Sequence, residues 1–371
     1  MVRLGDVATY INGYAFKPSD WSDNGLPIIR IQNLTGNDYE TNYYSGDYDK
    51  KYEVNNGDVL ISWSASLGVY EWKNDKALLN QHIFKVQFDK LSVDKNYFIH
   101  TITYLLNDMA KETHGSTMKH ITKPRFDNTL FPYPSLQIQR EISQNLDKVT
   151  HLIDLCNQIL DKLDLLVKSR FVEMFGEIHN SSKYHYKPVS SFTQVISGGT
   201  PNRDVAEYWE NGTIPWVKTT ELKNDIIIDA EEYITDKGLQ DSSAKIVPPN
   251  TILIAMYGQG KTRGMTAYLS IEASTNQACA CILPSKNMNQ LYLWQYFILS
   301  YEKLRSMAKG GNQPNLNGNI IKNFPVLLPP IELQNQFAAF VEQTDKSKLA
   351  VKKVLEKAST LKKALMQEYF G

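Results

Sequence analysis

Apolar residues recur every three or four positions over two long stretches of the chain, and each stretch predicts a long helix. From residue 142 onward the spacing alternates between four and three for more than three heptads, the pattern of a coiled-coil seam. No Gly or Pro occurs between residues 136 and 175. The alternative is an ordinary amphipathic helix on a globular core. The predicted seam positions are Ile142, Leu146, Val149, Ile153, Cys156, Leu160, Leu163 and Val167.

The second stretch, which ends at residue 371, carries a wider and less regular apolar stripe, interrupted at Ser347 and Lys348. Its predicted seam includes Val351, Leu355 and Ala358. Two imperfectly matched helices favour mutual antiparallel pairing. At about 1.5 Å per residue, some forty residues make a rod of roughly 58 Å, longer than one turn of DNA at about 34 Å. Such a rod is suited to act as a spacer.

The two helical stretches are copies of one sequence. Residues 136–176 return as 331–371 at a constant offset that also relates Gln139 to Gln334 and Phe175 to Phe370. Upstream the match loosens but persists, since residues 4–13 match 189–198 and Asn80 falls opposite Asn276. Two units of this length predict a pseudosymmetric molecule and not a solenoid. The matched positions, which form a shared frame, are retained in both copies, while the loops between them differ.

Short strand patterns alternate with Gly, Asn and Asp turns in both copies, and helical patterns follow at 93–113 and 288–310. The fold class predicted is α+β (mixed α/β), with two pseudosymmetric domains separated by two long antiparallel coiled-coil helices. A proline-bearing segment precedes each helix, and Phe-Gly ends each one, as expected for a left-handed cap. The predicted domains are 1–132, 133–177 (helical), 178–328 and 329–371 (helical).

Composition narrows the class of protein. The 371 residues carry 40 basic and 40 acidic side chains, so no global positive charge indicates a nucleic-acid partner. No long apolar run predicts a membrane span or a signal peptide, so a cytoplasmic protein is expected. Cys279 and Cys281 are one residue apart, which suits a strand and not a zinc site, and Cys156 stands alone on a helix. All three cysteines are interpreted as structural.

Polar and basic residues gather in the loops between the predicted strands, at corresponding places in the two copies. Arg, Lys, Gln and Asn pair with base edges, and Ser and Thr contact phosphates. A single polar loop is more often merely solvated, but equivalent loops that diverge on a retained frame favour a reader of two different sequences. The candidate DNA-binding residues are Lys17, Arg30, Gln32, Asn33, Ser62, Ser64, Lys119, Arg203, Lys218, Thr219, Tyr257, Gln259, Lys261, Arg263, Gln313 and Asn315.

No catalytic or metal site is predicted. The segment 258–262, Gly-Gln-Gly-Lys-Thr, resembles a phosphate-binding loop, but Ala255 stands where that motif requires Gly. The chain has no Asn-Pro-Pro-aromatic methyltransferase tetrapeptide. We find no Gly-rich cofactor turn, spaced His-Glu metal set or nucleophile elbow. Catalysis, if any, is expected to belong to partner proteins.

Over its whole length, the chain resembles a specificity subunit of a type I restriction-modification system. The most specific resemblances are the two joints before the helices, FPYPSLQIQREI and FPVLLPPIELQNQ, and the two helix ends, SRFVEMFG and ALMQEYFG. The resemblance implies a non-catalytic subunit of a host-defence complex, in which each recognition domain reads one half of a bipartite, asymmetric site in double-stranded DNA.

The resemblance also implies partners: two methyltransferase (modification) subunits bound through the helices, and restriction subunits that translocate DNA. S-adenosylmethionine, ATP and magnesium would sit on those partners, and no cofactor on this chain. The family has no fixed base-contact motif, so the candidate residues rest on loop chemistry alone. Two alternatives remain open: a coiled-coil scaffold whose globular ends bind other proteins, and a self-sufficient restriction or modification enzyme.

Overall fold

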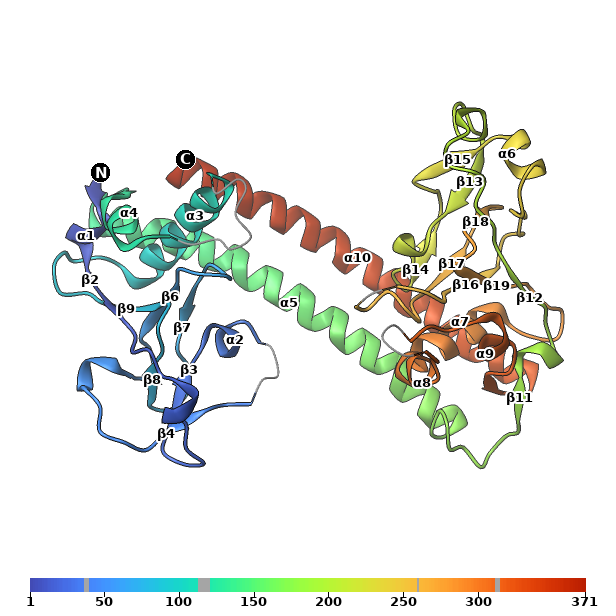
Figure 1. Ribbon diagram of the computed structural model, residues 1–371, viewed down its shortest axis with the longest axis horizontal. Helices are drawn as coiled ribbons and strands as arrows, with labels where there is room; N and C mark the ends of the chain where they lie inside the picture. Colours follow the sequence, from blue (N-terminus) through green and yellow to red (C-terminus); the bar gives the residue numbers. More distant parts are fainter. Residues whose placement is uncertain (37–39, 113–120, 259, 311–313) are drawn as a thin grey trace. The chain divides into compact units, whose positions relative to one another are not determined.

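The chain folds into two compact units. The computed structural model describes residues 1–36, 40–112, 121–258, 260–310 and 314–371. The first unit comprises residues 1–157 with 352–371, and the second comprises residues 158–351 (Figure 1). These bounds cut through both long helices, so each unit contains the beginning of one helix and the end of the other.

Two long helices occur within the predicted helical regions 133–177 and 329–371. Helix α5 spans Leu136–Phe175 and α10 spans Ile331–Phe370, 40 residues each. Gly176 follows α5 with φ of +84°, and its N–H donates to the carbonyl of Val172 at 2.8 Å. This confirms the left-handed cap predicted from the Phe-Gly ending. No helix in the described part of the chain is long and apolar enough to cross a membrane.

Within each unit the two helices pair antiparallel. In the first unit, near the start of α5, the Asn145 amide donates to the Tyr369 hydroxyl near the end of α10, at 3.4 Å. In the second unit Asp164 and Lys348 form an ion pair at 2.7 Å. Also in the second unit, Phe175 of α5 lies 5.6 Å from Phe337 of α10, so positions later in α5 meet positions earlier in α10, which confirms the predicted antiparallel direction.

The first unit contains two four-stranded sheets. One is antiparallel, in the order β2 (Thr9–Asn12), β9 (Ile83–Gln87), β6 (Val59–Ser62) and β7 (Gly68–Glu71). The other has the order β4 (Tyr43–Tyr44), β3 (Leu26–Ile29), β8 (Ala77–Leu79) and β5 (Glu53–Val54), with β3 and β8 parallel. Strands β1 (Val2–Arg3) and β10 (Leu130–Phe131) pair separately, and the helices are α1 (Leu4–Val7), α2 (Ile31–Leu34), α3 (Lys95–Glu112) and α4 (Lys123–Asn128).

The second unit repeats this frame with additions. Its larger sheet has the order β12 (Val195–Ser197), β19 (Cys279–Ile282), β16 (Ile252–Ala255), β17 (Thr266–Leu269) and β14 (Asp225–Ile227). The smaller sheet has β15 (Glu232–Ile234), β13 (Ile214–Val217) and β18 (Ser274–Thr275), with β13 and β18 parallel as β3 and β8 are. Strands β11 (Tyr186–Pro188) and β20 (Pro325–Leu327) pair, and the helices are α6 (Asp236–Gln240), α7 (Gln290–Leu299), α8 (Tyr301–Ser306) and α9 (Gly318–Lys322).

Backbone details confirm that the two units share one frame. Gly57 and Asn250, aligned in the sequence, both adopt positive φ, of +91° and +67°. Gly13 and Gly198 both lie where the chain passes closely over the segment after the parallel strand. A Cβ on Gly13 would approach the Asn80 carbonyl oxygen to 2.0 Å, so only glycine fits there.

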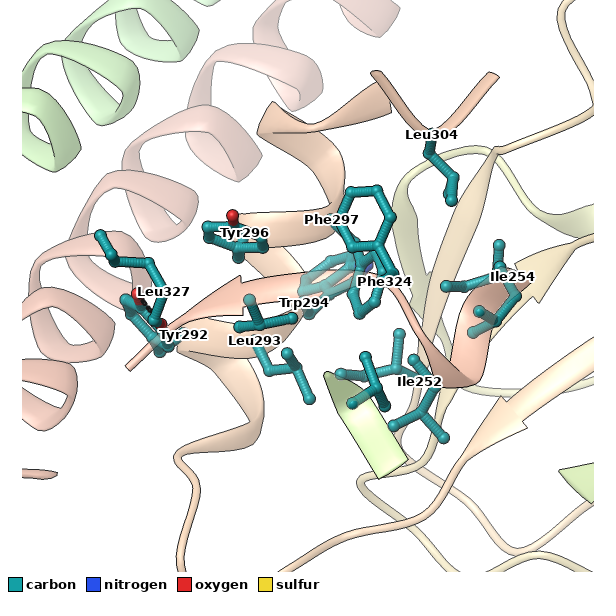
Figure 2. Packing of buried hydrophobic residues seen from close by; sticks show 14 of the residues in the cluster. Ile252, Ile254, Tyr292, Leu293, Trp294, Tyr296, Phe297, Leu304, Phe324 and Leu327 are labelled. Carbon is teal, nitrogen blue, oxygen red and sulfur yellow. Dashed lines mark hydrogen bonds between the residues drawn. The ribbon is translucent and has the colours of Figure 1, made fainter. Parts of the chain in front are cut away.

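The core of the second unit is completed by both long helices. Figure 2 shows Tyr292, Trp294 and Tyr296 of α7 packed among residues from the strands and from the segment before β20. Phe175, at the end of α5, lies 5.4 Å from the Tyr292 ring and 5.6 Å from Phe337, near the start of α10. Because these aromatic side chains are fully buried, each contributes about 1.5–3 kcal/mol through lost contact with water.

The first unit is completed in the same way. Leu146, near the start of α5, shares a buried cluster with Met366 and Phe370 at the end of α10. The Phe370 ring lies 5.6 Å from Tyr97 of α3, as Phe175 lies beside Tyr292 in the second unit. Each unit therefore uses the start of its own long helix and the end of the long helix from the other repeat.

A buried glutamine fixes each joint between a globular region and its helix. Gln139 Oε1 accepts from the Asp94 N–H at 3.0 Å, and its Nε2 donates to the Pro134 carbonyl at 2.8 Å. Gln334 makes the equivalent bonds, at 3.0 Å to the N–H of Asn289 and at 2.8 Å to the carbonyl of the proline five residues before it. Each amide thereby ties the N–H of the residue before the shorter helix, α3 or α7, to the proline-bearing segment before the long helix.

The structure differs from the sequence expectation at two places. The segment 26–34, Leu-Pro-Ile-Ile-Arg-Ile-Gln-Asn-Leu, is one of the short strand patterns in the sequence, but its strand ends at Ile29, because the following residues form the helical turn α2. The helical pattern at 288–310 is divided into α7 and α8 at Ser300, whose N–H bonds back to three carbonyls at the end of α7. The first unit has a single continuous helix at the corresponding place.

Candidate DNA interface

The candidate DNA-reading loops occupy corresponding places in the two units. Residues 63–67 join β6 to β7, and residues 256–265 join β16 to β17. Arg30 follows β3 directly, and Lys218 follows β13 directly. The candidates therefore lie where the frames agree and the sequences differ, as expected for a surface that changes its specificity on a fixed scaffold.

Arg30 and Lys218 begin equivalent turns. The Arg30 N–H donates to Asn33 Oδ1 at 2.9 Å, and the Lys218 N–H donates to Glu221 Oε1 at 2.7 Å. A side chain that reaches back to the residue before a helical turn caps that turn. The oxygen of Asn33 therefore holds the turn in shape.

The Arg30 side chain is held by uncharged groups. Its Nη1 donates to Asn42 Oδ1 at 3.1 Å, and its guanidinium carbon lies 5.5 Å from the ring centre of Trp21, which is 39% exposed. An amide and an indole orient a guanidinium without neutralising it. Arg30 therefore presents an oriented positive charge at the end of β3.

Lys218 and Arg203 are paired with acidic residues. Lys218 Nζ lies 2.7 Å from Glu232 and 3.1 Å from Glu231. Hydrogen bonds to these two carboxylates raise the pKa of Lys218, and the bond to Glu232 has the larger effect. Arg203 also pairs with Glu232 and lies 3.8 Å from the ring centre of Trp209. These carboxylates therefore offset part of the positive charge that either residue offers to a phosphate or base. No sequence pattern predicted these acidic partners.

The two serine candidates of the first unit are buried. Ser62 is fully buried, and its hydroxyl donates to the Ser66 carbonyl inside the hairpin. Ser64 is also buried, with 8% of its surface exposed. The hydroxyl of Ser62 therefore shapes the turn between β6 and β7, and a direct contact of either serine with DNA stays a prediction.

The loop between β16 and β17 separates its candidates into outward and inward groups. Tyr257 is 42% exposed, and Lys261 is exposed. Arg263 is turned toward the protein, where its Nη1 donates to the Pro314 carbonyl. Tyr257 and Lys261 therefore face outward, whereas Arg263 bonds the protein, and all three stay predicted candidates.

The remaining candidates have less defined environments. Lys17 is exposed, Gln32 and Thr219 are half-buried, and the backbone of half-buried Asn315 pairs with Lys309 in both directions. The predicted candidates Lys119, Gln259 and Gln313 lie outside the described residues.

A family model decides the class of protein. The model of the type I restriction modification DNA specificity domain matches residues 1–165 and 182–359, which is most of the chain and covers both repeats. The chain belongs to this family. Members are the non-catalytic specificity subunits of type I restriction-modification systems, which recognise DNA target sequences, direct the enzymatic subunits and assemble with the other subunits of the complex.

Individual relatives agree. The chain is 23% identical over 404 residues to the type I restriction enzyme EcoBI specificity subunit of Escherichia coli, with 100% of this chain and 85% of that subunit covered. The S subunit of the type I system from M. genitalium has the same fold, with a TM-score of 0.55 at 14% identity over 100% of this chain and 95% of that one. A chain from a structural study of type I complex assembly and conformational transition gives a TM-score of 0.56 at 16% identity, covering 100% of this chain and 96% of that one.

The helices of this specificity subunit form a seam that includes a charged position. Among the predicted seam residues, Leu146, Cys156, Val167 and Ala358 are buried, and Ile142, Val149, Ile153, Leu160, Leu163, Val351 and Leu355 are half-buried. Lys348, predicted to interrupt the stripe, has only 17% of its side chain exposed and pairs with Asp164 and Asp345. A single buried charged position specifies the register and partner of a coiled coil.

Helix α5 of the specificity subunit also carries a second apolar stripe that the sequence reasoning missed. Leu152, Leu155, Ile159 and Leu166 are 41%, 39%, 42% and 48% exposed. Their spacings of three, four and seven place them on one side of a helix, apart from the seam. Exposed apolar side chains at helical spacing are typical of a face that receives another helix.

Proposed function

We propose that the two units are two recognition domains that each read one half of a bipartite DNA site. The observation that carries the proposal is the duplicated frame, with Arg30 and Lys218 on equivalent turns and with different residues in every loop around them. One scaffold with two sets of side chains suits a target with two unlike halves. The predicted recognition domains are residues 1–132 and 178–328.

The paired helices, at 133–177 and 329–371, are the proposed spacer. Forty residues of α-helix extend over about 60 Å, whereas one turn of DNA rises about 34 Å. A rigid element of this length fixes how many base pairs lie unread between the half-sites. Inserting one heptad into both helices is expected to lengthen the accepted spacer, and an unchanged spacer would contradict this role.

The proposed partners are double-stranded DNA, two methyltransferase subunits and restriction subunits, in the cytoplasm. The stripe formed by Leu152, Leu155, Ile159 and Leu166 supports docking of a methyltransferase helix on α5. The duplication supports two copies of that partner, because each repeat supplies an equivalent joint. The balance of 40 basic and 40 acidic residues agrees with a chain that reads bases while its partners hold much of the duplex.

The test is co-expression with the methyltransferase subunit of the same restriction-modification system, followed by sequencing of methylated bases in the host DNA. One bipartite motif with a methylated adenine in each half is expected. The variant Lys261→Ala should relax or weaken one half-site only, and Lys303→Ala, an exposed lysine on α8, serves as the control. Equal loss at both half-sites would refute the assignment of Lys261 to one reader.

The scaffold alternative makes a different prediction. A DNA reader loses affinity steeply as salt rises, with log K falling by roughly 0.9 per log salt for each phosphate neutralised. A protein-binding scaffold gives no such slope. An intact complex that leaves no methyl mark and retains no DNA at low salt would favour the scaffold.

A further inference from the structure

We propose that Arg305 and Tyr301 are positioning residues that set the sequence preference of the second recognition domain. They act through the loop at 257–264, which contains the outward-facing candidates Tyr257 and Lys261. The inference rests on the proposed function, because it names the residues that hold one reading loop in its working shape.

The contacts form a continuous set along the loop backbone. Arg305 Nη2 donates to the Gly260 carbonyl at 2.9 Å, and its Nη1 donates to the Arg263 carbonyl at 2.7 Å. The Tyr301 hydroxyl donates to the intervening Lys261 carbonyl at 2.6 Å and accepts from Arg305 Nη1 at 3.0 Å. Three loop carbonyls are therefore held by two side chains of one short helix.

The loop depends on such support because its own backbone is permissive. Gly258, Gly260 and Gly264 have φ of +145°, +58° and +86°, values that glycine adopts without a side-chain penalty. A glycine-rich segment samples many conformations unless other groups select one. Gly264 lies directly on Arg305, since a Cβ there would come within 3.1 Å of Arg305 Cγ. The fork of donors on a guanidinium suits this selection, because it bridges two acceptors in a fixed plane.

Backbone and side chain of Lys261 face opposite environments. Its carbonyl is held by Tyr301, while the side chain is exposed. Holding the carbonyl therefore fixes the direction in which the Lys261 side chain extends from the loop. The same helix that orders the backbone thus orders the charge presented to DNA.

The support belongs to one reader and not to the shared frame. The offset that aligns the repeats places Leu106 and Ala110 opposite Tyr301 and Arg305, and leucine and alanine side chains carry no hydrogen-bond donor. In the first unit the hydroxyl of Ser62 holds the corresponding loop from within. A role in maintaining the shared fold does not explain Tyr301 and Arg305, because only the second copy has them. Support for a loop that has its own sequence preference explains why only one copy has them.

The experiment compares the methylated motifs of the complete complex carrying wild-type subunit, Arg305→Met, Tyr301→Phe or Lys303→Met. Lys303→Met removes a positive charge from an exposed position of the same helix, two residues before Arg305. Arg305→Met is expected to lower discrimination at the half-site of the second unit about tenfold, by analogy with the loss of one good base contact. In Arg305→Met, discrimination at the half-site of the first unit should stay unchanged. In Lys303→Met, discrimination at both half-sites should stay unchanged.

Tyr301→Phe removes one hydroxyl and keeps the ring, so it tests the same idea without a charge change. It should relax the same half-site to a smaller extent. Unchanged motifs in both variants, or equal relaxation of both half-sites, would overturn the inference. A wild-type complex that marks no bipartite motif would overturn the proposed function itself, and that failure is visible before any variant is compared.

Discussion

Replacing Gln139 with Leu should loosen the joint between the first globular region and α5. The side chain is fully buried, and its amide bonds the Asp94 N–H and the Pro134 carbonyl. A leucine of similar length fills the space but leaves both backbone groups without partners. Each unsatisfied buried group costs about 1–3 kcal/mol, and the added apolar surface offsets about 1 kcal/mol. The expected loss is about 1–5 kcal/mol for the first unit.

Hydrogen exchange measures this loss at the atom concerned. In Gln139→Leu the Asp94 amide should lose protection by a factor of about 5 or more, since each 1.4 kcal/mol changes an equilibrium constant about tenfold. Protection of the Asn289 amide, held by Gln334 in the second unit, should stay at its wild-type level. The reciprocal variant, Gln334→Leu, should reverse the pattern.

The matched control is Gln137→Leu. Gln137 is exposed two residues earlier on α5, and its amide donates to Glu141 at 3.1 Å within the same helix. An exposed pair four residues apart contributes about 0.2–0.5 kcal/mol. If Gln137→Leu destabilised the protein as much as Gln139→Leu, or if the Asp94 amide kept its protection, the role given to the buried amide would be wrong.

Three further changes test the packing. Burial raises the pKa of the Asp345 carboxyl, so the folded protein binds the carboxyl proton more tightly than the unfolded chain does. The protonated carboxyl therefore adds stability at low pH, and this stability is lost as the pH rises through the raised pKa of the folded state. Asp345→Asn should therefore raise the urea midpoint at pH 7, with little effect below the usual carboxyl pKa. Gly13→Ala places a Cβ 2.0 Å from the Asn80 carbonyl oxygen and should cost about 1–3 kcal/mol in thermal or urea denaturation. Burial raises the pKa of Cys281 to about 11 and also raises that of Cys279, so an aromatic disulfide reagent at pH 8 should label neither thiol until the protein unfolds.

Local and periodic features were predictable from the sequence. The bounds of α5 and α10 followed from an apolar repeat without Gly or Pro, closed by a Gly that caps α5 with left-handed φ. The strands β6 and β16 followed from short apolar runs, because both are buried along their whole length. The duplication added a check that one copy alone does not offer, since Gly57 and Asn250 share one unusual backbone shape.

The partners of individual side chains were not predictable, because they lie far away in the sequence. Arg263 bonds a carbonyl 51 residues later, and Arg305 reaches back 42 residues to the Arg263 carbonyl. Lys218 is paired by glutamates of a neighbouring strand whose position no spacing reveals. Ser62 was predicted as a candidate DNA contact, yet it is fully buried at the end of β6. A loop's composition gives its chemistry but not the direction of its side chains.

The crossed use of the helix ends affects the order in which the two units fold during synthesis. The buried cluster of the second unit draws on residues from Val167 to Val341, all of them translated before the end of α10. The first unit begins at residue 1 but includes Met366 and Phe370, among the last residues of the chain. Domains ordinarily fold in the order in which they leave the ribosome. The first unit begins to be translated earlier, but its core is complete only after the end of α10 has been made. The core of the second unit is therefore completed before that of the first.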